Sequence, residues 1–134
     1  MTESYGKCGP GLLTPVKGLP LDDASRKALP IFTFLTEYFP DVVVELTKLC
    51  VAGNIQHNKD LAPADIKWVR EKSKDQLNTA FRHLWDRAIG THYDADGIAH
   101  LTKTVWRSMA QRQLDIEAER AFLAEARSGN HPIC

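Results

Sequence analysis

Apolar residues recur at helical spacing in two separate stretches of this chain, and no stretch shows the strict alternation of a β-strand. The first stretch leads from Val43 to Val51. The second places five large residues on one stripe: Leu77, Phe81, Leu84, Trp85 and Ile89. A repeat of three to four residues is typical of an amphipathic helix, whereas strands repeat every two residues. The sequence therefore predicts an all-α domain.

Proline and glycine residues give the expected ends of the helices. Pro40 is expected in the first turn of a helix, where its missing N–H group is not needed. Gly53 and Asn54 are expected to end that helix, because both residue types tolerate the left-handed conformation. Gly90 is expected to end the next helix. A long final helix is expected from about Ile98 to Arg127.

The beginning of the chain reads differently from the rest. Four glycines and three prolines fall between residues 6 and 20, which forbids a regular element there. We therefore expect an extended arm over residues 1–24, followed by a single compact helical domain over residues 25–134. A chain of 134 residues is large enough for one core and too small for two.

Charge and composition narrow the possible partners. Lys plus Arg equals Asp plus Glu at 17 each, so no net charge draws the protein towards polymeric nucleic acid or a membrane. An anion site must come from local clustering. The three cysteines share no metal-ligand spacing. The sequence shows neither a signal-peptide pattern nor a long apolar stretch, so a cytoplasmic protein is expected.

Cationic residues cluster in three places along the second half of the chain. The segment "KWVREKSKD" holds four of them together with Trp68 and Ser73, and others follow on the next two predicted helices. Arginine gives bidentate contacts to phosphate, lysine supplies a point charge and tryptophan can stack on a base. This set is typical of a nucleotide pocket, and it is also compatible with a solubilising surface.

Acidic and histidine residues raise the question of a metal. "DADG" resembles the front of a calcium loop, but that register puts Lys103 where the bidentate glutamate belongs, so we expect a turn that caps the last helix. His57, His83, Asp86 and His100 could together bind a transition metal, although no HExxH or CxxC motif supports this. For His83 and Asp86, three residues apart, a surface ion-pair network is the alternative.

Three longer segments carry a family resemblance. They are "YFPDVVVELTKLCVAGNIQHN", "WVREKSKDQLNTAFRHLWDR" and "DADGIAHLTKTVWRSMAQRQL". In this order they resemble the consecutive motifs of a mostly bacteriophage family named for the N-terminal domain of dATP/dGTP diphosphohydrolase. The resemblance covers about residues 29–114, and the joint occurrence of the motifs is far more specific than any one of them.

The resemblance implies an activity and a setting. The family name implies cleavage of purine deoxynucleoside triphosphates to monophosphates and pyrophosphate, in the cytoplasm of an infected bacterium. If the protein is catalytic, Mg²⁺ is the expected cofactor. The paired acidic motifs of all-α MazG-type pyrophosphatases are not found here in order. The alternative is a sponge that sequesters a linear or cyclic nucleotide immune signal without altering it, as an anti-defence protein.

The motifs and the cationic clusters together give one predicted site for a small-molecule nucleotide. "AGNIQHN" contributes more polar groups than a helix end requires, although capping and local backbone bonds could also account for them. The predicted nucleotide and phosphate ligands are Asn54, His57, Asn58, Trp68, Arg70, Lys72, Ser73, Arg82, His83, Asp86, Lys103 and Arg107. No catalytic residue and no metal ligand is assigned among them.

The final predicted helix also indicates an oligomer. Met109, Ile116 and Leu123 lie seven residues apart, with Trp106 and Phe122 beside them. A stripe with this repeat and charged flanks suits packing against another helix, although it could instead fold back on its own domain. We expect a homo-oligomer, at least a dimer, in light scattering. A 15.0 kDa monomer at high micromolar concentration would contradict this expectation.

Overall fold

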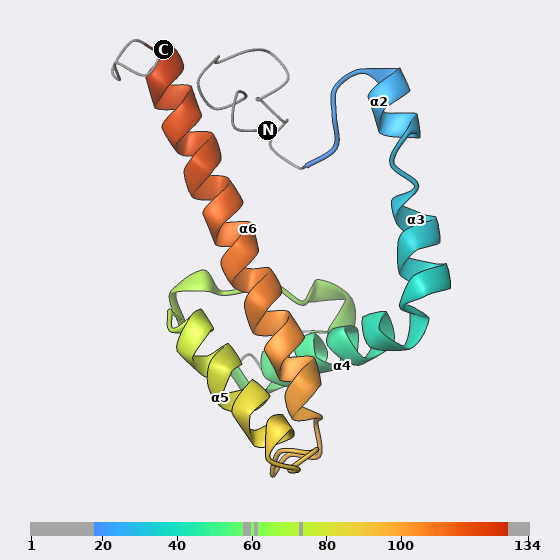
Figure 1. The fold of residues 1–134 in the computed structure, drawn as a ribbon, viewed down its shortest axis with the longest axis vertical. Helices are drawn as coiled ribbons and strands as arrows, with labels where there is room; N and C mark the ends of the chain where they lie inside the picture. Colours follow the sequence, from blue (N-terminus) through green and yellow to red (C-terminus); the bar gives the residue numbers. More distant parts are fainter. Residues whose placement is uncertain (1–17, 58–59, 61, 73, 129–134) are drawn as a thin grey trace. The chain divides into compact units, whose positions relative to one another are not determined.

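The computed structural model describes residues 18–57, 60, 62–72 and 74–128, and within them the predicted all-α fold is confirmed. Five α-helices occur in that part of the chain: α2 (Asp23–Lys27), α3 (Ile31–Thr33), α4 (Pro40–His57), α5 (Gln76–Ala88) and α6 (His100–Arg127) (Figure 1). A π-helical turn, Phe34–Tyr38, links α3 to α4, and two 3₁₀ turns, Pro63–Asp65 and Arg70–Lys72, precede α5. None of the described helices is both long and apolar enough to cross a membrane.

The chain divides by its internal packing into two units. The first runs from Phe32 to Arg112 and contains the π-helical turn, α4, α5 and the beginning of α6. The second consists of Met1–Ile31 together with Gln113–Cys134. Every predicted site residue falls within the first unit.

Helix α2 begins inside the region predicted as an extended arm. Asp22 caps it by accepting a hydrogen bond from the Ser25 N–H at 2.8 Å, an interaction that satisfies a free donor in the first turn. Asp23 and Lys27 form an exposed ion pair one turn apart. Asp23 and Ala24 of the predicted arm are therefore helical, and residues 1–17 of that arm lie outside the described residues.

Helix α4 starts as predicted but does not stop where predicted. Pro40 is its first residue, and Asp41 lies beside it at the positive end of the helix dipole. The helix continues through Gly53 and Asn54 to His57, so the stop predicted at Gly53 is wrong. Glycine weakens a helix interior by only about 0.5–1 kcal/mol relative to alanine, which a well-bonded helix tolerates. Continuation keeps Asn54 and His57 one turn apart on one side of α4.

Helix α5 ends as predicted but shows its apolar stripe to solvent. Gly90 has a positive φ of 105° just after the helix. Phe81 is 62% exposed and Trp85 is 57% exposed, and the other three residues of the stripe are also exposed. The residues of α5 that are buried, Gln76 and Ala80, lie on the opposite face. The helix therefore turns its more polar face towards the rest of the unit.

Helix α6 begins two residues later than predicted, at His100. A β-bridge between Tyr93 and Ala99 holds the preceding loop as a hairpin, and the "DADG" turn forms inside it with Gly97 at φ 81°. Asp96 accepts a hydrogen bond from the Ile98 N–H at 3.0 Å, which closes the turn. The turn prediction is confirmed, but Asp96 binds within the loop and does not cap α6.

The residues chosen for an oligomer stripe on α6 do not share one environment. Met109 is exposed, Ile116 is half-buried and Leu123 is buried, while Trp106 contacts residues of the first unit. In the first unit, the most exposed apolar stripe of a helix is that of α5, described above. The homo-oligomer stays a prediction.

The glycines of the first unit give a direct test of how α4 ends. An added Cβ at Gly53 would meet no atom within 4 Å, and its φ is not positive. Gly53→Ala should therefore stabilise the protein by about 0.5–1 kcal/mol in urea denaturation. Gly90→Ala is the matched control, because its φ of 105° should cost about 1–2 kcal/mol. A loss of stability in Gly53→Ala as large as that in Gly90→Ala would contradict a helix continuing through Gly53.

Candidate functional site

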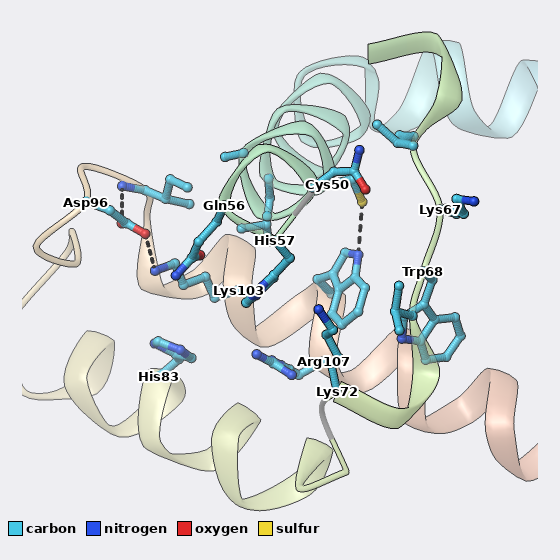
Figure 2. A pocket seen from close by; sticks show the side chains of 18 residues that line it. Cys50, Gln56, His57, Lys67, Trp68, Lys72, His83, Asp96, Lys103 and Arg107 are labelled. Carbon is cyan, nitrogen blue, oxygen red and sulfur yellow. Dashed lines mark hydrogen bonds and ion pairs between the residues drawn. The ribbon is translucent and has the colours of Figure 1, made fainter. Parts of the chain in front are cut away.

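A cavity of about 710 Å³ lies inside the first unit. Its walls are formed by the second half of α4, residues 66–72, His83 of α5, the loop at Asp96 and Ile98, and the first two turns of α6 (Figure 2). Segments more than fifty residues apart in the sequence thus meet around one space. The cavity is within the size range of small-molecule sites, about 300–1,000 Å³.

The α4 wall is polar because the helix continues to His57. Asn54 is buried, and Gln56 and His57 are exposed at the cavity. Cys50 lies one turn before Asn54 on α4. It is half-buried, and its Sγ accepts a hydrogen bond from the Trp106 indole at 3.1 Å. This bond joins α4 to α6.

Two tryptophans lie side by side in the wall. The rings of Trp68 and Trp106 pack edge to face, 5.7 Å between centroids and 77° between planes. The Arg70 guanidinium lies over the Trp68 ring at 4.3 Å, and that of Arg107 lies 5.5 Å from the Trp106 ring centroid. The Trp68 Nε1 atom is buried and has no hydrogen-bond acceptor among the described residues. The rings offer flat apolar surface, which the two arginines make locally positive.

Cationic side chains outnumber acidic ones around the cavity. Lys67, Lys72 and Arg107 line it, and the one carboxylate that the described residues place in its wall, that of Asp96, is bound by Lys103. Arg107 donates to the Gln76 Oε1 at 3.1 Å. Burial lowers the pKa of the Arg107 guanidinium, and the charge of Arg82 lowers it further, but arginine remains protonated in proteins. The cavity therefore has a positive potential.

Lys103 holds the loop before α6 against that helix. Its Nζ donates to Asp94 Oδ2 and to Asp96 Oδ2, each at 2.7 Å. These hydrogen bonds lower the pKa of both carboxyl groups. Burial of Lys103 lowers the pKa of its ammonium, but the two carboxylates raise this pKa by more, so the net shift is upward. All three groups are consequently charged at neutral pH, and the lysine ammonium takes the place between two carboxylates that a metal ion could otherwise occupy.

Two histidines meet next to this ion cluster. The Nδ1 atoms of His83 and His100 are 2.8 Å apart, and His100 is only 4% exposed. The Oδ2 of Asp86 lies 3.9 Å from the other ring nitrogen of His100. Burial lowers the pKa of His83, and the positive charge of Lys103 lowers it further against the opposing effect of Asp94. A neutral His83 can share one proton with His100 through the short contact.

The predicted site residues separate into three groups. Those that line the cavity are Asn54, His57, Trp68, Lys72, His83, Lys103 and Arg107. Those that lie outside its lining are Arg70, which covers Trp68, Asp86, which neighbours His100, and Arg82, which donates to Thr79 Oγ1 at 3.0 Å. Asn58 and Ser73 lie outside the described residues. Lys103, predicted as a phosphate ligand, lines the cavity, and its ammonium forms ion pairs with two aspartates.

Four further polar or aromatic residues of the lining were not in the predicted set: Gln56, Lys67, Asp96 and Trp106. Each lies inside or directly beside one of the quoted motifs. Gln56 stands within "AGNIQHN", Asp96 within "DADG", Trp106 within "KTVWR", and Lys67 precedes Trp68. The motif strings alone could therefore have identified them, whereas their side-chain directions depend on the fold.

The sequence model of a family described as dATP/dGTP diphosphohydrolase, N-terminal, matches residues 22–122. This match covers about three quarters of the 134 residues. The chain belongs to this family. No curated protein and no solved structure gives a significant match.

Segments of the matched region that are distant in the sequence meet around the cavity. "AGNIQH" contributes residues to the α4 wall, "WVREK" to the aromatic and cationic wall, and "DADGIAH" with "KTVWR" to the wall of the loop and α6. The diphosphohydrolase reaction in the family name implies Mg²⁺, an ion that prefers oxygen ligands. Among the described residues, the adjacent carboxylates of Asp94 and Asp96 are already bound by Lys103, so the cavity does not present a free carboxylate pair for Mg²⁺.

The lysine between the two aspartates should stabilise the first unit. Lys103→Met removes both charge-assisted hydrogen bonds and leaves two carboxylates beside each other, so we expect a loss on the order of 1–3 kcal/mol in urea denaturation with a chelator present. Lys48→Met is the matched control, because Lys48 is exposed and lies 3.8 Å from Glu45, and it should change stability by less than about 0.5 kcal/mol. Equal effects of the two substitutions would contradict a structural role for Lys103.

Proposed function

We propose that the first unit binds a purine deoxynucleoside phosphate in the cavity between α4, residues 66–72 and α6. The observation that carries this proposal is the combination of two tryptophans with Lys67, Lys72 and Arg107 around one space. Aromatic rings bind a base by stacking, and lysine and arginine bind phosphate oxygens. The family description supplies the purine and the deoxyribose.

Neutral hydrogen-bonding groups complete the proposed site. Asn54 and Gln56 offer amide donors and acceptors from α4, and His57 offers a ring nitrogen. Groups of this kind fix the orientation of a ligand in a pocket whose affinity comes from stacking and charge.

The same residues favour binding over hydrolysis within this cavity. Metal-assisted phosphoryl chemistry requires carboxylates that can hold a cation against the phosphates. In the part of the lining that the structure describes, Asp96 supplies the one carboxylate, and Lys103 already binds it. We therefore propose that the domain holds its nucleotide without cleaving it, and that any hydrolysis depends on groups outside this cavity.

A sequestering role follows from this proposal as the second candidate function. A protein that binds a nucleotide signal tightly and releases it intact can act as a sponge, and the lysine-bound carboxylate favours that behaviour. In this form the protein would act in the cytoplasm of an infected bacterium against a nucleotide-based defence. The ligand could then be linear or cyclic.

Binding can be measured by isothermal titration calorimetry with dATP and dGTP. Lys72→Ala should weaken binding by about 1.5–3 kcal/mol, roughly 10–150-fold, because it removes a charge-assisted contact from the cavity wall. Lys48→Ala is the matched control: it removes an exposed lysine from α4, outside the cavity lining, and should leave the affinity unchanged. Equal affinities of wild-type protein and a Lys67→Ala/Lys72→Ala double variant would contradict the proposed site.

The fate of the ligand separates a binding protein from an enzyme. The protein is incubated with dATP or dGTP and Mg²⁺ and then heat-denatured, and the released nucleotide is separated by chromatography. We expect the triphosphate to return intact. Monophosphate and pyrophosphate, formed by wild-type protein and not by the Lys67→Ala/Lys72→Ala double variant, would show that the cavity hydrolyses its ligand.

A further inference from the structure

A cluster of two histidines and one aspartate lies where α5, the hairpin loop and α6 meet. One ligand atom from each of His83, Asp94 and His100 can be chosen so that all three lie within 4.8 Å of one another. His83 comes from α5, Asp94 from the loop, and His100 is the first residue of α6. We propose that these three side chains bind one divalent first-row transition-metal ion such as Zn²⁺, a function that goes beyond nucleotide binding and does not depend on it.

The spacing of the two histidines suits a shared ion. Imidazole nitrogens that each lie about 2.0–2.1 Å from one metal ion are roughly 3 Å from each other. The Nδ1 atoms of His83 and His100 are 2.8 Å apart, so a small rotation of the rings directs both towards one ion. The ion replaces the proton that the two nitrogens share, and that proton leaves to solvent.

Asp94 can supply the third ligand without releasing its present partners. A carboxylate has about four lone-pair positions. Two are used in the structure, by the Ala95 N–H at 2.7 Å and by the Lys103 ammonium at 2.7 Å. The hairpin holds Asp94 in place, because its N–H donates to the Ile98 carbonyl at 2.9 Å and the His100 N–H donates to the His92 carbonyl at 3.0 Å.

Asp86 lies where a small side-chain movement would let its carboxylate orient His100. Its Oδ2 lies 3.9 Å from Nε2 of His100, on the side of the ring away from His83. Histidine ligands commonly direct their second nitrogen to a carboxylate, which orients the ring and makes the ligating nitrogen more basic. A buried histidine with another imidazole on one side and a carboxylate on the other has this arrangement.

The two imidazole ligands favour a transition-metal ion over magnesium. Imidazole suits zinc, copper, iron and nickel, whereas magnesium favours oxygen ligands. His83 also lines the cavity, so the ion would lie at the cavity edge (Figure 2). The nearby Lys103 ammonium opposes a second positive charge, so the affinity should rise when that charge is removed.

Metal binding can be measured on the full chain without nucleotide. We expect Co²⁺ to bind with a 1:1 stoichiometry and a visible absorption band, Zn²⁺ to displace it, and Mg²⁺ at the same concentration to leave the band unchanged. His83→Gln and Asp94→Asn should each weaken Co²⁺ binding at least tenfold, and Asp86→Asn by about 10–100-fold. His92→Gln is the matched control, because it alters an exposed histidine of the same loop and should not change the affinity.

A second measurement needs no variant and so does not depend on how the substitutions fold. In heteronuclear NMR of the wild-type protein, Zn²⁺ should shift the imidazole nitrogens of His83 and His100 and leave those of His57 and His92 unchanged. The absence of a cobalt band, unchanged Co²⁺ affinity in His83→Gln, or zinc shifts at His57 or His92 in place of the pair would overturn the proposal. Because these measurements contain no nucleotide, their results do not bear on the nucleotide proposal, which is tested by its own experiments.

Discussion

The first two turns of α6 are the part of the molecule on which the site depends. Residues at positions 100, 103, 104, 106 and 107 each bind a different neighbour: His100 meets His83, Lys103 binds the loop, Thr104 donates weakly to the Ala80 carbonyl, Trp106 binds Cys50, and Arg107 binds Gln76. A helical repeat places these residues on two adjoining sides of α6. One side is held by α5 and the other by α4, and the cavity lies next to both.

This arrangement explains why α5 presents its polar face to the rest of the unit. Gln76, Ala80, His83 and Asp86 of α5 meet α6, and three of the four are polar because their partners are Arg107 and His100. The helix therefore contributes hydrogen bonds to the site, and its large apolar residues are left on the outer face. An exposed stripe of this kind usually marks a surface that another molecule covers.

Helical spacing in the sequence was sufficient to predict α4, α5 and α6 but not α2, and proline at position 40 and glycine at position 90 predicted two of the helix ends. The helix end predicted at Gly53 was wrong because glycine occurs inside helices as well as at their ends. Only the backbone hydrogen bonds of the following turn show whether the helix continues or stops. The motifs brought Asn54, His57, Trp68, Lys72 and Arg107 into one predicted site, and the structure places all five around the cavity. Lys103 carries the same charge as Lys72, and its role could not be read from residue type, because it depends on a loop that folds back onto α6.

The central claim is that a nucleotide occupies the space between α4, residues 66–72 and α6, and the three tryptophans of the chain allow a direct test. Trp68 and Trp106 line the cavity, whereas Trp85 is exposed on the outer face of α5. Their indole N–H signals can be followed by ¹H–¹⁵N NMR as dATP is added. The account predicts that the Trp68 and Trp106 signals shift together along one saturation curve while Trp85 stays unchanged. A shift confined to Trp85, or no shift of any indole at saturating dATP, would contradict it.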